Sequence, residues 1–176
     1  MLLRFKFSNF RSFRTEQELS LVAGPLKDHS EGLFEIPGLK ERVLPVAAIY
    51  GANASGKTTV LRALQFMKRV IRESHRLWEP EQNIPLEPFV GESDKCPATF
   101  VVDFICETVR HQYGFVLNAS AVLEEWLHAY PSGHKQTWFR RKAGEPMSFS
   151  EKLSGENKVI EQLTGCATWK WEMRLD

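Results

Sequence analysis

Eight residues in the first third of the chain constrain its fold more than any others. Residues 51–58 read Gly-Ala-Asn-Ala-Ser-Gly-Lys-Thr, which fits the pattern G-x-x-x-x-G-K-[ST] without a mismatch. Gly51 and Gly56 let the backbone curl so that successive N–H groups point at one phosphate, and a side chain at Gly56 would hinder that approach. The segment therefore predicts a phosphate-binding loop between a strand and a helix.

The residues on both sides of this loop have the patterns that such a site needs. Residues 46–50, Val-Ala-Ala-Ile-Tyr, form a short apolar run without alternation, which is typical of a strand buried on both faces. After the loop, apolar residues recur at helical spacing, at Val60, Leu64, Met67 and Ile71. The sequence thus predicts a buried strand, the loop and a helix over about residues 58–75.

Each residue of the loop has an expected part in binding a nucleoside triphosphate. The predicted binding residues are Gly51, Ala52, Asn53, Ala54, Ser55, Gly56, Lys57, Thr58 and Thr59. Lys57 can place its ammonium between the β- and γ-phosphates, and Thr58 can offer its hydroxyl to Mg²⁺. The N-terminal dipole of the following helix adds positive potential. Thr58 is therefore the predicted metal ligand.

Two alternating segments precede the loop and predict a pair of neighbouring strands. Leu3, Phe5 and Phe7 alternate with mostly basic residues, and residues 17–21 repeat the alternation. Between them lies Asn-Phe-Arg-Ser-Phe, in which two aromatic residues bracket Arg11. Arg11 is either a solvated surface residue or a ligand of the bound nucleotide, because its planar donor fork suits phosphate oxygens. Residues 24–45, rich in Gly and Pro, predict a long loop.

The chain beyond the helix predicts an antiparallel block. Four prolines between positions 80 and 97 rule out a helix there. Short apolar or alternating runs follow, separated by turn residues, at 99–105, 112–117, 121–129 and 136–141. A strand, loop and helix with a separate antiparallel sheet differ from a small GTPase or a nucleoside kinase, in which further parallel β-α units follow the loop helix.

Composition limits the classes of partner and compartment. With 176 residues, 43% of them hydrophobic, the chain can bury one good core, so one domain is expected. With a net charge of +1, any binding of nucleic acid would have to come from a local basic patch. The predicted helix has a basic face that either is such a patch or simply faces water; its residues are Arg62, Lys68, Arg69, Arg72 and Arg76. Three cysteines at no metal spacing and the lack of a long apolar run predict a cytoplasmic protein without a membrane span.

Several segments together are similar to a known class of ATPases. Residues 9–13 and 51–61 resemble the start of the ABC-type heads of the SMC, Rad50 and RecF class, especially the bacterial AAA15 or OLD-like ATPases. Later segments are similar in order and spacing to the antiparallel subdomain of the AAA15 group: Pro-Phe at 88–89, Thr-Phe-Val-Val-Asp-Phe at 99–104, Tyr-Gly-Phe-Val-Leu at 113–117, Glu-Glu-Trp-Leu at 124–127 and Trp-Phe-Arg-Arg at 138–141.

The resemblance implies a mixed α/β fold, that of the head lobe of a P-loop NTPase. It makes residues 1–165 the N-terminal portion of an ABC-type head, with an antiparallel block at about 99–141, and residues 166–176 a divergent or truncated tail. It implies ATP and Mg²⁺ as cofactors. The resemblance further implies an ATPase that dimerises head to head around two ATP molecules. Many proteins of this class act in anti-phage defence with a nuclease-like partner. On this resemblance the chain is expected to be an incomplete head.

Two elements that hydrolysis requires in that class lack a convincing counterpart. An apolar strand ending in Asp-Glu is expected, but Asp103 is followed by Phe104, and Glu124 and Glu125 lie in a sheet strand without an Asp. Residues 152–157, Lys-Leu-Ser-Gly-Glu-Asn, imitate a signature loop. The alternative function is therefore a nucleotide-binding module without turnover. A GTPase is disfavoured, because Asn157-Lys158-Val159-Ile160 ends in Ile where the guanine-binding carboxylate belongs.

Overall fold

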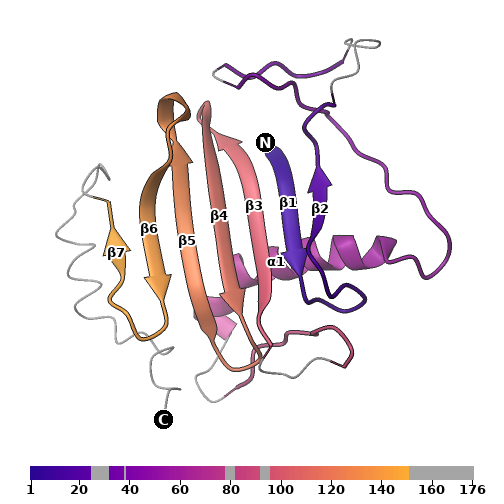
Figure 1. Cartoon of the computed structure of the whole chain (residues 1–176), viewed down its shortest axis with the longest axis vertical. Coiled ribbons are helices and arrows are strands. Elements are labelled where there is room, and N and C mark those ends of the chain that lie inside the picture. The colour runs from indigo at the N-terminus through magenta and orange to yellow at the C-terminus, as the bar shows by residue number, and fades with distance from the viewer. Residues whose placement is uncertain (25–31, 38, 78–81, 92–95, 151–176) are drawn as a thin grey trace.

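The fold is one antiparallel sheet with a long helix across one face (Figure 1). A computed structural model describes residues 1–24, 32–37, 39–77, 82–91 and 96–150. The seven strands lie in the order β2-β1-β3-β4-β5-β6-β7. Their bounds are β1 Leu2–Ser8, β2 Gln17–Ser20, β3 Ala98–Cys106, β4 Val109–Leu117, β5 Val122–Tyr130, β6 Gln136–Lys142 and β7 Ser148–Phe149. The helix is α1, Lys57–Leu77, and a 3-10 turn, η1, spans Pro131–Gly133.

All the predicted strands of the antiparallel block are confirmed, and the N-terminal pair joins them in the same sheet. β1 pairs with β2 on one side and with β3 on the other, placing Phe5 opposite Val102 and Phe7 opposite Phe100. The prediction of a separate antiparallel sheet is therefore wrong, because the block shares one sheet with β1 and β2. β1 lies between β2 and β3, and its alternating Phe side chains are buried beside the apolar positions of β3.

The core lies between this sheet and α1. From the sheet come Phe5, Phe7, Phe100 and Phe115, each at most 1% exposed, with the rings of Phe100 and Phe115 5.4 Å apart. From the helix come Ala63, Phe66, Met67 and Val70. Val60 and Leu64 pack at the edge of this stripe, but Ile71, predicted to be buried, is 49% exposed. The buried stripe is thus rotated slightly from the one read in the sequence, because Phe66 enters the aromatic cluster.

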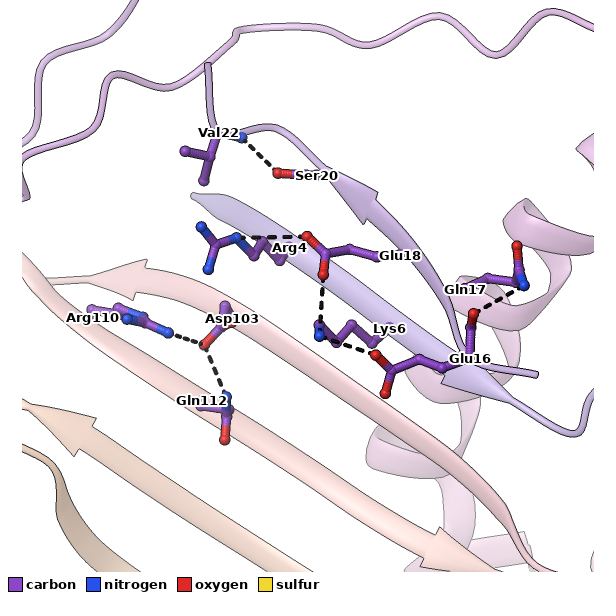
Figure 2. A network of polar contacts seen from close by, with 10 residues as sticks. All are labelled: Arg4, Lys6, Glu16, Gln17, Glu18, Ser20, Val22, Asp103, Arg110 and Gln112. Carbon is purple, nitrogen blue, oxygen red and sulfur yellow. Dashed lines mark hydrogen bonds and ion pairs between the residues drawn. The ribbon is translucent and has the colours of Figure 1, made fainter. Parts of the chain in front are cut away.

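The opposite face of the sheet carries paired charges (Figure 2). Lys6 contacts Glu16 and Glu18, and Arg4 lies 3.7 Å from Glu18. Farther along the face, the side chain of Asp103 is 6% exposed and accepts hydrogen bonds from Arg110 and Gln112. Side chains alternate across a strand, so Asp103 points away from α1 while Phe100 and Val102 point toward it. This face offers matched charge rather than a basic patch.

Residues 46–50 correct the prediction of a buried strand before the loop. They form no strand and are exposed, with Val46 at 73% and Tyr50 at 89%. A strand is stabilised by hydrogen bonds to neighbours, and no described segment pairs with this one. The predicted long loop at 24–45 is anchored by the fully buried Val43, which bridges to Val22 and Phe34. Among the described helices, none is long and apolar enough to cross a membrane.

Candidate phosphate-binding site

The loop at residues 51–56 curls tightly and leads directly into α1. Ala54 and Gly56 have φ values of 62° and 91°, in the left-handed region. The N–H of Ser55 donates to the carbonyl oxygen of Ala52 over 3.3 Å, and Lys57 is the first helical residue. Left-handed residues beside right-handed ones turn successive N–H groups toward one side, the geometry of an anion-binding nest.

Lys57 folds back over this loop. Its ammonium donates to the carbonyl oxygens of Gly51, at 2.7 Å, and Ala52, at 2.5 Å. A Cβ at Gly51 would approach the hydroxyl oxygen of Ser55 to 2.7 Å, so a larger residue there would force the Ser55 side chain to move. The two carbonyl contacts hold the positive charge at the loop, where a phosphate would lie in a site of this type.

The start of α1 presents backbone donors. The N–H groups of Thr59 and Val60 donate to the carbonyl oxygen of Gly56. Those of Gly56, Lys57 and Thr58 donate to no backbone carbonyl within the described residues. Residues 51–55 and Thr58 are exposed. Exposed donors at the N-terminus of a helix are the usual partners of an anion. The arrangement can therefore bind a phosphate group.

The β1–β2 hairpin packs against this helix start. The hydroxyl of Ser12 donates to the hydroxyl oxygen of Thr59 over 3.0 Å, and Thr59 is only 9% exposed. The ring of Phe13 lies so close to Gly56 that a Cβ there would come within 2.4 Å of it. Of the predicted site residues, Thr59 thus has its hydroxyl engaged by the hairpin. Ser12 and Phe13 were not predicted as part of the site.

Arg11 lies in the same hairpin turn and is held by Glu87. Its backbone has φ 52°, and its N–H donates to the carbonyl oxygen of Glu87 over 2.8 Å. Its guanidinium Nη2 lies 2.5 Å from the Glu87 carboxylate, with the two side chains 27% and 59% exposed. Arg11 is therefore an ion-paired, half-buried residue rather than a freely solvated one. Glu87 gave no sequence signal beyond its place between two prolines.

Asn9 fixes the segment that carries Glu87. Its amide nitrogen donates to the carbonyl oxygens of Cys96 and Pro97, and its amide oxygen accepts the N–H of Phe89. Asn9 is 7% exposed and has φ 51°, a conformation that asparagine tolerates better than most residues. The Asn-Phe-Arg-Ser-Phe turn thus contacts the helix start on one side and residues 87–89 and 96–97 on the other.

The carboxylates considered for hydrolysis lie elsewhere. Asp103 is on the face away from α1, and Glu124 pairs with Arg140 at 2.9 Å. Glu125 accepts the phenol hydrogen of Tyr113 at 2.6 Å and contacts Arg141 at 2.8 Å. Each is already engaged by a neighbouring side chain. Residues 152–157 and 166–176 lie outside the described residues, and no group of three metal-binding side chains occurs within the described ones.

Glu125 lines a hollow of about 470 Å³ at the other end of α1, together with Ile71 and Ser74. The 14 residue steps from Lys57 to Ile71 correspond to about 21 Å of helix at about 1.5 Å each. Burial, followed by the charge of Glu125, raises the pKa of Tyr113. The polar cluster in this hollow therefore belongs to the packing of the sheet, at a distance from the loop.

Comparison with known protein families matches a region that includes the loop. Residues 46–151 match the family described as "AAA domain, putative AbiEii toxin, Type IV TA system". The matched region covers more than half of the chain and runs from the loop and α1 through β3 to β7. Comparison with curated protein sequences gives no significant match.

Proposed function

Because the chain belongs to this family of AbiEii toxin-like AAA domains, we propose that it binds ATP with Mg²⁺ at residues 51–58. The observation that carries the proposal is the curled loop at the N-terminus of a 21-residue helix, with the ammonium of Lys57 held at the loop. The N–H groups of the loop and of the helix start bind the phosphates, Lys57 offsets the β- and γ-phosphate charge, and Thr58 is a ligand of Mg²⁺.

Isothermal titration with Mg·ATP tests this assignment. Lys57→Ala should abolish measurable binding, because it removes the ammonium that offsets the β- and γ-phosphate charge in a loop whose other phosphate donors are backbone dipoles. Lys68→Ala is the matched control, since Lys68 is exposed on the same helix about three turns from the loop. Unchanged affinity in a folded Lys57→Ala variant would refute the site. GTP titrated in parallel distinguishes an ATP site from a guanine-specific one.

Arg11 is proposed as a further contact to the nucleotide. The support is its place between Asn9, which fixes the turn, and Ser12 and Phe13, which contact the start of α1. Loss of one charge-assisted hydrogen bond in Arg11→Ala should weaken ATP binding by about 1 to 3 kcal/mol. Arg11→Lys should restore it only in part, because lysine lacks the planar fork. A nucleotide-bound structure with Arg11 more than about 8 Å from the phosphates, beyond any hydrogen bond, contradicts the contact.

A second candidate function is nucleotide binding without turnover. It is favoured by the positions of Asp103, Glu124 and Glu125, all of which are paired with basic or phenolic side chains away from the loop. In-line attack on the γ-phosphate needs a carboxylate that positions Mg²⁺ and water. Purified chain should therefore bind ATP without hydrolysing it. Turnover near about 1 per second, abolished by Lys57→Ala, would assign the chain to the first candidate instead.

The finer relationship proposed is to the AAA15 and OLD-like ATPases with ABC-type heads. On this basis the ATPase head forms a homodimer around two ATP molecules in the cytoplasm, with a nuclease-like protein as partner and nucleic acid as a further ligand. The family description, which names a toxin of a type IV TA system, supports a part in anti-phage defence. Light scattering with and without Mg·ATP tests the dimer. Induced expression of wild type and Lys57→Ala tests for nucleotide-dependent growth arrest.

A further inference from the structure

The side chain that holds Arg11 is itself an anion. Glu87 presents its carboxylate to Arg11 Nη2 at 2.5 Å, and both side chains reach the surface. Arg11 Nε is buried and has no hydrogen-bond partner within the described structure. Glu87 thus satisfies only part of the donor fork of the guanidinium. A phosphate group, with three oxygens, can accept from more of these donors than one carboxylate oxygen does.

The backbones of the two residues are fixed, so only their side chains can separate. The N–H of Arg11 donates to the carbonyl oxygen of Glu87, independently of either side chain. On the side before Glu87, Ile84 and Leu86 are 4% and 9% exposed and belong to the core. On the side after it, the N–H of Phe89 donates to Asn9. Movement of Arg11 toward a ligand therefore requires its guanidinium to leave a stationary Glu87.

We propose that Glu87 is an internal competitor of the nucleotide for the guanidinium of Arg11. The Glu87 carboxylate holds Arg11 in the nucleotide-free protein, and the phosphates of ATP displace it. This inference rests on the proposed function of the loop and on the Arg11 contact. A guanidinium shared between both anions would bring the carboxylate close to the triphosphate, and the repulsion between like charges favours exchange over sharing. Glu87 therefore lowers the affinity of the site for ATP.

The test is a double-mutant cycle on the full chain, with Mg·ATP affinity measured by titration calorimetry. Glu87→Gln keeps the size of the side chain and removes its charge. It should tighten binding about two- to five-fold, the range that exposed ion pairs support. In an Arg11→Ala background the same substitution should change affinity less than about 1.5-fold, because its partner is gone. Glu145→Gln, which removes an exposed carboxylate paired with Lys142 at the other end of the sheet, should have no effect.

Each other outcome overturns the proposal in a distinguishable way. If wild-type protein does not bind Mg·ATP, the proposed function fails and the competition fails with it. If wild type binds and Glu87→Gln binds equally, the site stands and the competition is wrong. Weaker binding by Glu87→Gln would make Glu87 a positioning residue for Arg11. Equal tightening with and without Arg11 would show that Glu87 acts on the triphosphate directly, by repulsion.

Discussion

Gly56→Ala should be among the most damaging single substitutions in the described part of the chain. Two separate costs meet at this position. The backbone has φ 91°, and a left-handed conformation costs a residue with a Cβ about 1 to 2 kcal/mol. The new methyl group would also lie 2.4 Å from Cζ and 2.8 Å from Cε2 of Phe13. Overpacking of this kind costs about 1 to 3 kcal/mol, so the expected total is about 2 to 5 kcal/mol.

Gly144→Ala separates the two costs. Gly144 has φ 76°, similar to that of Gly56, but a Cβ there meets no atom within 4 Å. Gly144→Ala therefore reports the backbone cost without the steric cost. Both substitutions also lower the conformational entropy of the unfolded chain, so this contribution cancels when the two are compared. The difference between the two substitutions should be the steric cost of about 1 to 3 kcal/mol. Urea unfolding followed by tryptophan fluorescence measures both.

Phe13 provides the decisive background for this comparison. In Phe13→Ala protein the ring that blocks the new methyl group is gone, so Gly56→Ala should then cost no more than Gly144→Ala. Equal losses for Gly56→Ala and Gly144→Ala in the wild-type background would refute the steric argument, and with it the packing of the hairpin on the loop. ATP titration should show reduced affinity for Gly56→Ala, because the loop cannot keep its curvature.

Three further predictions concern the proposed metal ligand and the sheet. Thr58→Ala should weaken ATP binding in Mg²⁺ but not in EDTA, and equal losses in calorimetry would count against the hydroxyl ligand. The pKa of Tyr113 is raised by burial and by Glu125, so its phenol stays protonated in the folded state. The folded state should therefore lose stability as the pH rises above about 10, where the phenol of the unfolded chain ionises. Tyr113→Phe should reduce that loss, measured by urea titrations at about pH 8 and about pH 11. Gly114→Ala should displace Trp126, whose ring would lie 2.3 Å from the new Cβ, and shift its fluorescence; an unchanged spectrum would contradict this packing.

Local patterns in the sequence were sufficient to predict most of the elements. The four strands of the antiparallel block and the helix after the loop were predicted close to their observed bounds, because turn residues punctuate them and their apolar positions repeat with a clear period. The prediction of a buried strand at residues 46–50 is wrong for a physical reason. An apolar run indicates that burial is favourable, whereas a strand exists only where neighbouring strands accept its hydrogen bonds, and those neighbours are not encoded in the run itself.

The contacts around the loop show why a motif predicts chemistry better than it predicts regulation. Residues 51–58 could be recognised because the phosphate-loop pattern fixes residue type and spacing together at Gly51, Gly56, Lys57 and Thr58. Glu87 contacts Arg11 because the proline-rich segment that carries it is held in place by the buried side chains of Ile84 and Leu86. Such a contact has no spacing rule. The contact between Glu87 and Arg11, on which the proposed competition rests, is therefore found only in the fold and not in the sequence.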